Sequence, residues 1–282
     1  LVLKFLENVL KMKIGIIGTG NMATSLIKGF QSQKKNKIYC FDLDSKKLSF
    51  FKKAGGVKIA TNNKEVVEKS EIIFLCVKPN SVSIVLEEIK KTLTPKKLLV
   101  SIAAGVKISY IEKYIGRKFK IIRSMPNLPC LVSKGVFGFK ANSRANIKDI
   151  ESFLLLVSTV GKAFEIKKEK DFDYITAISG SGPAFLAEYI AAQLVYAGSK
   201  GLSSSLAKQL VFETIIGAVE YLKVTGISPS AFVDLVSSPG GTTVEGVNVL
   251  KNKKFTNIII KCFDSASKKS KEIADKLVLE KN

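Results

Sequence analysis

From residue 13 to about residue 164, short apolar runs alternate with segments whose apolar residues recur at helical spacing. The strand-like runs, rich in β-branched residues, are expected at 13–17, 38–41, 57–60, 72–77, 98–103, 120–123 and 136–140. The helical spacings are expected at 22–30, 82–93, 109–115 and 147–160. This alternation predicts an α/β fold with a doubly wound, mainly parallel sheet and right-handed crossovers.

The first strand-like run leads into a glycine-rich turn with the spacing G-x-G-x-x-A. Gly18 permits a tight turn, Gly20 lets the backbone approach a pyrophosphate, and Ala23 lets the next helix pack closely on the strand. Asp42 ends the second strand, about 20 residues further on, where such a site places an acidic residue. The pattern predicts a Rossmann dinucleotide-binding site. The residues expected at the dinucleotide are Gly18, Thr19, Gly20, Asn21, Met22 and Asp42.

Two further turns follow predicted strands and should reach the same crevice, because ligands of such sheets sit beyond the carboxyl ends of the strands. They place Cys76, Val77, Lys78, Pro79, Ala103 and Ala104 near the cofactor. For the thiols Cys76 and Cys130, core packing is the favoured interpretation. Lys78 is either a cofactor-side cation or a solvated turn residue.

After about residue 165 the pattern changes to helices alone, expected at 184–197, 203–224, 231–236, 244–252 and 256–278. The segment 184–197 is apolar nearly all round, which predicts burial on every side. In a small helical domain this favours burial against a second subunit, hence a homodimer or a higher oligomer. The predicted organisation is an N-terminal extension at 1–11, a Rossmann domain at 12–164, and an all-helical dimerisation and substrate domain at 165–282.

Two predicted loops of the helical half carry consecutive small and hydroxyl residues just before a predicted helix. Backbone amides and hydroxyls at a helix N-terminus can hold an anion such as a carboxylate. The alternative is that each segment is only a flexible cap. The residues expected at a substrate are Ser179, Gly180, Ser181 and Gly182 in the first, and Gly240, Gly241, Thr242 and Thr243 in the second.

The chain has a net charge of +21, but only three of its 45 basic residues are arginines, and the lysines are scattered without interleaved aromatics. This disfavours nucleic-acid binding, while the positive field suits anionic cofactors and carboxylate substrates. No apolar stretch reaches membrane-spanning length. Residues 1–11 lack a small-residue cleavage site and are predicted to be an extension upstream of a start at Met12 rather than a signal peptide.

Histidine is absent, and the four cysteines are widely spaced without a C-x-x-C pair. A metal site would need thiolates or carboxylates that do not cluster in the sequence, so no metal is expected. Reduced thiols and a cytoplasmic protein are the favoured interpretation.

Several motifs together resemble one family over residues 12 to about 272. They are IGIIGTGNMA from Ile14, LCVKPN from Leu75, VSIAAGV from Val100, RSMPNLPCLVSKG from Arg123, ITAISGSGPAF from Ile175 and VSSPGGTTVEGV from Val236. In this order they are similar to the pyrroline-5-carboxylate reductase family. The resemblance implies reduction of 1-pyrroline-5-carboxylate to L-proline with NADH or NADPH, the last step of proline biosynthesis. It also implies an interlocked dimer with substrate where the two domains meet.

By position, the resemblance assigns Asn63 to the cofactor ribose, and Val77–Pro79 and Ala104 to the nicotinamide side. It assigns Glu169 and the amides of Gly241–Thr243 to the substrate, with the Thr243 hydroxyl on the ring nitrogen as the catalytic group. Departures from the family pattern occur at Glu213-Thr214, Ser228-Pro229 and Ser270. They affect expected dimer packing more than chemistry.

The residues favour the same chemistry independently of the resemblance. Oxidising an alcohol with a nicotinamide cofactor needs a base such as His or Lys near the hydride. This chain has no His, and the helix from Pro183 lacks the lysine that hydroxyacid dehydrogenases of similar plan carry there. A protonated cyclic imine already carries its electrophilic charge, so positioning it is the main task.

Three alternatives stay open at this point. Asp42 could favour NADH, whereas Lys46 and Lys47 could hold the phosphate of NADPH, and Asp42 could instead be a turn residue capping the next helix. The enzyme could reduce another small imine or hydroxyacid, which competition by L-proline would distinguish. The chain could also be a Rossmann nucleotide sensor without turnover.

Overall fold

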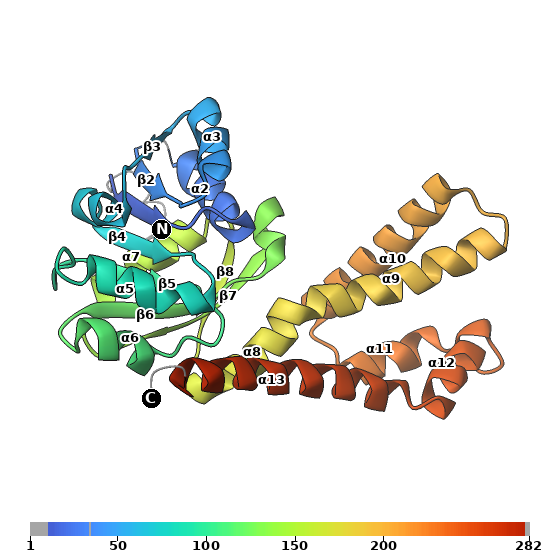
Figure 1. Ribbon diagram of the computed structural model, residues 1–282. Helices are drawn as coiled ribbons and strands as arrows, with labels where there is room; N and C mark the ends of the chain where they lie inside the picture. The colour runs from blue at the N-terminus through green and yellow to red at the C-terminus, as the bar shows by residue number, and fades with distance from the viewer. Residues whose placement is uncertain (1–10, 34, 280–282) are drawn as a thin grey trace. The chain divides into compact units, whose positions relative to one another are not determined.

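The computed structural model describes residues 11–33 and 35–279 (Figure 1). The predicted extension at 1–11 lies, apart from Lys11, outside the described residues. No helix in the described part of the chain is both long and apolar enough to cross a membrane.

Eight strands form one sheet in the order β3-β2-β1-β4-β5-β6-β7-β8. All neighbours pair in parallel except β6 and β7, which are antiparallel. The strand order reverses at β1 and β4, so a crevice opens beyond their carboxyl ends. The strands are β1 (Lys13–Ile17), β2 (Lys37–Phe41), β3 (Val57–Ile59), β4 (Ile72–Leu75), β5 (Leu98–Ser101), β6 (Lys120–Met125), β7 (Gly135–Ala141) and β8 (Gly161–Glu165).

Helices cover both faces of this sheet, and each face has its own apolar core. On β4 the side chains alternate, with Phe74 in one core and Ile73 and Leu75 in the other. The first core takes residues from α2 (Asn21–Ser32), α3 (Ser45–Ala54) and α7 (Ile147–Val157). The second takes residues from α4 (Asn63–Lys69), α5 (Val82–Ile89) and α6 (Ile108–Ile115). The predicted doubly wound α/β fold is confirmed, although α3 and α4 were not among the predicted helices.

The predicted helix at 147–160 is too long, and the strand after it is missing from the prediction. The helix α7 ends at Val157, and β8 then pairs in parallel with β7, with Gly161 opposite Gly135. A Cβ on Gly161 would lie 2.2 Å from the Gly135 carbonyl oxygen, so only glycine allows this approach. The five residues of β8, GKAFE, are too few and too polar to show a clear strand pattern.

After β8 the described elements are all helical. Three short 3-10 turns also occur along the chain: η1 (Pro79–Ser81) after β4, η2 (Leu128–Val132) after β6 and η3 (Glu169–Asp171) after β8. The remaining elements are α8 (Phe172–Ile175), the π-helix η4 (Thr176–Ser181), α9 (Gly182–Ser199), α10 (Ser204–Thr225), α11 (Pro229–Val236), α12 (Thr242–Asn252) and α13 (Phe255–Leu279).

The chain forms two compact units, one up to Gly180 together with the segment from Ala266, the other Ser181–Ser265. The final segment belongs to the first unit because the Ser270 hydroxyl donates to Asp173 at 2.7 Å and Ala274 packs at Gly105. The division predicted at 164, drawn from the change in pattern, stays a prediction. In the second unit α9 and α10 lie side by side (Figure 1).

Candidate functional site: a dinucleotide cavity at the reversal of strand order

The two glycines of the G-x-G turn differ in what constrains them. Gly18 has a φ of +88°, and a Cβ there would lie 2.9 Å from the Cys76 carbonyl oxygen, so the turn itself requires glycine. Gly20 is the N-cap of α2 with a φ of −70°, and a Cβ there would meet no atom within 4 Å. No side chain of the described residues caps α2, so its first amides suit an anion such as a diphosphate.

A cavity of about 400 Å³ lies in the crevice beyond the ends of β1, β2 and β4. It is roomy enough for part of a dinucleotide and is lined largely by apolar side chains, as ligand sites usually are. Of the predicted cofactor residues it brings together Gly18, Gly20, Asp42, Asn63, Cys76, Val77 and Lys78. The residues that complete its lining are Ile17, Phe41, Leu43, Lys47, Ser81, Ile84, Val85 and Glu88.

The other predicted cofactor residues do not line this cavity. Thr19 is buried within the turn itself, and Asn21 and Met22 open α2. Pro79 starts the 3-10 turn η1, and Ala103 and Ala104 follow β5. They flank the crevice at strand ends, and their contact with a cofactor stays a prediction.

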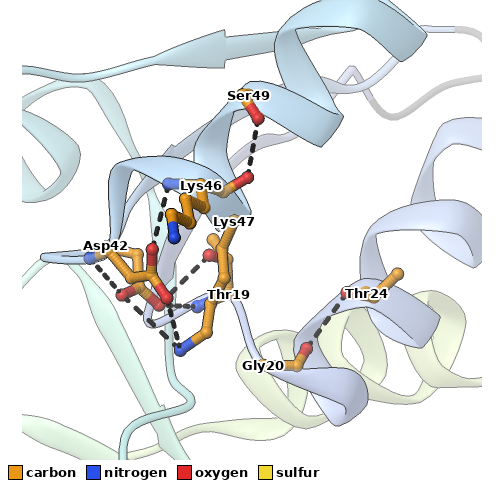
Figure 2. A network of polar contacts seen from close by, with 8 residues as sticks. Thr19, Gly20, Thr24, Asp42, Lys46, Lys47 and Ser49 are labelled. Atoms are coloured by element: carbon orange, nitrogen blue, oxygen red, sulfur yellow. Dashed lines mark hydrogen bonds and ion pairs between the residues drawn. The ribbon is translucent and has the colours of Figure 1, made fainter.

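Asp42 is held by the glycine-rich turn rather than standing free (Figure 2). Its Oδ2 accepts from the Thr19 amide at 2.6 Å and from the Thr19 hydroxyl at 3.1 Å, and its Oδ1 accepts from the Asp44 amide at 2.9 Å. Burial alone would raise the pKa of this carboxyl, but these bonds and nearby Lys47 bring the pKa below its usual range. Asp42 is therefore a fixed negative charge at the end of β2. The cap of α3 is Asp44, not Asp42.

Asn63 is buried, and its side-chain amide donates to Glu88 Oε2 at 2.8 Å. Both residues line the cavity, from α4 and α5 respectively. Glu88, which the sequence did not single out, thus orients the amide assigned to the ribose. The sequence of α5 gives no signal that Glu88, rather than its neighbour Glu87, turns toward Asn63.

The segment Ser179-Gly180-Ser181 is not a loop, contrary to the prediction. It lies in the π-helix η4, which runs from α8 directly into α9. The Ser179 hydroxyl donates to the Ile175 carbonyl at 2.8 Å, so the segment has no free helix N-terminus. Short π-helical turns occur frequently at functional sites, which is compatible with a substrate role for these residues. That role stays a prediction.

Asn127, from the RSMPN motif, fastens this π-helix to the sheet. Its Nδ2 donates to the Ser179 carbonyl at 2.9 Å, and its Oδ1 accepts from the Val136 amide at 2.8 Å. A Cβ on Gly180 would lie 3.2 Å from the Met125 side chain, so β6 packs closely here. The sequence analysis gave Asn127 no role. The available signal was an asparagine between two prolines in the motif RSMPNLPCLVSKG.

Arg123 is a second buried polar residue that the sequence did not assign. It is 4% exposed on β6, its Nη1 lies 3.0 Å from Glu169 Oε1, and its guanidinium stacks 4.1 Å from the Phe172 ring centre. The same Glu169 oxygen accepts from the Ile108 amide at 2.7 Å. Burial lowers the pKa of Arg123, and Glu169 opposes this. Glu169 Oε1 is thus engaged within the fold, and substrate contact by Glu169 stays a prediction.

The second predicted segment has the expected local form. Gly240 has a φ of +70°, and the Gly241 amide donates to the Ser238 carbonyl at 2.9 Å. Gly241 is the N-cap of α12 without a side-chain cap, so Thr242 and Thr243 lie in the first turn of that helix. Amides in this position can bind a carboxylate.

Together, the sheet order, the glycine turn and the cavity define a dinucleotide-binding protein of the Rossmann class. Two family models match this chain: pyrroline-5-carboxylate reductase dimerisation over residues 169–273, and NADP oxidoreductase, coenzyme F420-dependent, over residues 13–105.

Relatives matched over nearly their whole length carry the same family name as the first of these family models. The chain is 33% identical to pyrroline-5-carboxylate reductase of Methanosarcina acetivorans, covering 94% of this chain and 98% of the relative. It is also 33% identical to pyrroline-5-carboxylate reductase 2 of Bacillus subtilis, covering 93% and 95%. Among solved structures, pyrroline carboxylate reductase of Plasmodium falciparum with NADP bound matches with a TM-score of 0.85 at 33% identity, covering 95% and 99%. The chain belongs to the pyrroline-5-carboxylate reductase family.

Proposed function

We infer that this protein reduces 1-pyrroline-5-carboxylate to L-proline with NADH or NADPH, the last step of proline biosynthesis. The observation that carries this is 33% sequence identity to a pyrroline-5-carboxylate reductase over 94% of the chain, together with a dinucleotide cavity at the expected strand ends. The bound reduced nicotinamide would supply a hydride to the imine carbon. The proposed cofactor contacts are Gly18–Met22, Asp42, Asn63, Cys76, Val77, Lys78, Pro79, Ala103 and Ala104.

The chain's own residues suit this reaction because it needs positioning more than base catalysis. A protonated imine accepts hydride without loss of a hydroxyl proton, so the absence of histidine is no obstacle. We propose that the first amides of α12, at Gly241–Thr243, hold the substrate carboxylate, and that Ser179–Gly182 contribute as well. The Thr243 hydroxyl then hydrogen-bonds the ring nitrogen and orients the C=N bond.

Replacing Thr243 with alanine should lower kcat/KM for 1-pyrroline-5-carboxylate by roughly 10- to 100-fold, because one oriented hydrogen bond to the reacting group is lost. The dissociation constants for NADH and NADPH, measured by fluorescence titration, should stay within about two-fold of those of wild type. Thr243→Ser should recover most of the activity, since it keeps the hydroxyl.

The matched control is Thr256→Ala, an exposed threonine in the first turn of α13, which should leave kcat/KM unchanged. An equal loss of cofactor affinity in Thr243→Ala would show that Thr243 acts on the cofactor side, and the assigned role would be wrong.

We also propose that the protein works as a homodimer built on its helical unit. Helices α9 and α10 expose many large apolar side chains, among them Tyr196, Leu210, Phe212 and Ile216, each at least 45% exposed. Exposed apolar faces of this extent mark association surfaces. Sedimentation analysis should give at least twice the chain mass of 30.8 kDa, and a monomer at micromolar concentration would refute the proposal.

A cytoplasmic location is proposed on the state of the thiols. All four cysteines are unpaired, and Cys40, Cys76 and Cys130 have a raised pKa chiefly through burial, which makes them inert. Fractionation of the source cells should place the protein with cytoplasmic markers, and recovery from an oxidising compartment would contradict this.

A further inference from the structure

We propose that this protein binds NADH in preference to NADPH, and that the carboxylates of Asp42 and Asp44 set the preference. The inference deepens the proposed function, because it names the cofactor that the same cavity takes. In folds of this class, an acidic residue at the end of the second strand binds the ribose hydroxyls of NADH, whereas a nearby arginine accommodates the additional phosphate of NADPH.

Asp42 supplies a negative charge that cannot move away. Its side chain is 14% exposed, lines the cavity, and is anchored by the Thr19 amide, the Thr19 hydroxyl and the Asp44 amide. A carboxylate has about four acceptor directions, of which these bonds use three, so one remains for a ribose hydroxyl. A phosphate in the same place would meet a fixed like charge, which disfavours its binding.

Asp44 removes the other usual place for a phosphate, which is the N-terminus of the next helix. Its Oδ1 accepts from the Lys46 amide at 2.9 Å, so the start of α3 is already capped by a carboxylate. A helix N-terminus attracts anions through its free amides and its dipole. Here the Asp44 carboxylate already accepts from one of these amides, and it adds a second negative charge next to Asp42, to which its own amide is bonded.

Of the two lysines that line the cavity, Lys47 is the one on the side of Asp42, and it is already paired. Its Nζ lies 4.0 Å from Asp42 Oδ1 and 3.8 Å from Asp44 Oδ2. Asp42, Asp44 and Lys47 together therefore carry a net charge of about −1 at neutral pH. A phosphate would have to compete with two carboxylates for one lysine that is half exposed.

Lys46, the neighbouring lysine at the start of α3, does not line the cavity. None of the residues lining the cavity is an arginine, the side chain that binds phosphate in a bidentate manner. The second lysine of the lining, Lys78, follows β4, which lies on the opposite side of β1 from β2 and Asp42. Glu88 adds a further carboxylate to the lining.

The test is titration of the purified full-length protein with NADH and with NADPH, followed by nicotinamide fluorescence at fixed ionic strength without substrate. Wild type should bind NADH at least about 10-fold tighter than NADPH, and Asp42→Ser should reduce this ratio at least about five-fold, on the order expected for one removed charge. Asp44→Ser leaves the Asp42 anchors in place and should reduce the ratio about three-fold, which keeps the test decisive if Asp42→Ser misfolds.

The matched control is Asp275→Ser on α13, which removes the same charge from an exposed site outside the cavity lining and should leave the ratio unchanged. Equal or tighter binding of NADPH by wild type, or an unchanged ratio in both Asp42→Ser and Asp44→Ser, would overturn the proposal. Because substrate is absent, the result is separate from the proposed reaction. NADH preference without turnover of 1-pyrroline-5-carboxylate would refute only the reaction, and turnover without NADH preference would refute only this inference.

Discussion

Replacing Gly20 with valine should weaken binding of both NADH and NADPH by at least about 100-fold while leaving the fold intact. Space for the new side chain exists, because a Cβ at Gly20 meets no atom of the described residues within 4 Å. That open space faces the uncapped start of α2, where the backbone must approach the diphosphate. Fluorescence titration measures the affinity, and circular dichroism with thermal unfolding reports the fold.

Gly18→Ala provides the contrast, since Gly18 is constrained by the protein itself. Its φ of +88° and the 2.9 Å approach to the Cys76 carbonyl should make this variant unfold at lower temperature, whether or not cofactor is present. The assignment of Gly20 to close cofactor approach would be wrong if Gly20→Val bound NADH within about three-fold of wild type.

Replacing Arg123 with methionine should lower the free energy of unfolding by about 3 kcal/mol, because it removes one partner of a largely buried ion pair. Arg123 is 4% exposed and holds Glu169, which in turn binds the Ile108 amide. Loss of the guanidinium also removes its stacking on Phe172. Methionine retains much of the volume, so the effect reports mainly the lost charge and hydrogen bond. Denaturant unfolding measures the change.

Two variants make this result specific. Arg144→Met changes an exposed arginine and should alter stability by less than about 0.5 kcal/mol. The double variant Arg123→Met with Glu169→Met should be more stable than Arg123→Met alone, because no unpaired carboxylate remains. A loss below about 1 kcal/mol in Arg123→Met would mean that the pair does not fasten η3 to the sheet.

The glycine turn and the acidic residue that line the cavity could be predicted because their signals are local in sequence. Gly18 and Gly20 lie in the turn, Ala23 lies in the first turn of α2, and Asp42 directly follows β2, so a spacing rule is enough to place them. What Asp42 does could not be predicted, because three of its bonds depend on how the chain folds back at Thr19 and Asp44. The structure shows it anchored in the glycine turn, with Asp44 as the helix cap.

The features that the sequence missed depend on partners distant in sequence. Arg123 and Glu169 are 46 residues apart, and no local pattern pairs them. Serine and glycine favour turns, so the run Ser179–Gly182 predicted a loop. Contacts from Asn127 and Met125 instead accompany a π-helix there, a tertiary effect that overrides local preference. The pairing of Gly161 with Gly135 is likewise visible only once β7 and β8 are side by side.

The central claim, reduction of 1-pyrroline-5-carboxylate, is tested most directly by following loss of reduced-nicotinamide absorbance with and without the imine. The dimeric protein should oxidise NADH only when 1-pyrroline-5-carboxylate is present, form L-proline in equal molar amount, and be inhibited competitively by added L-proline. Folded protein that binds NADH but shows no imine-dependent oxidation with either cofactor would contradict the account.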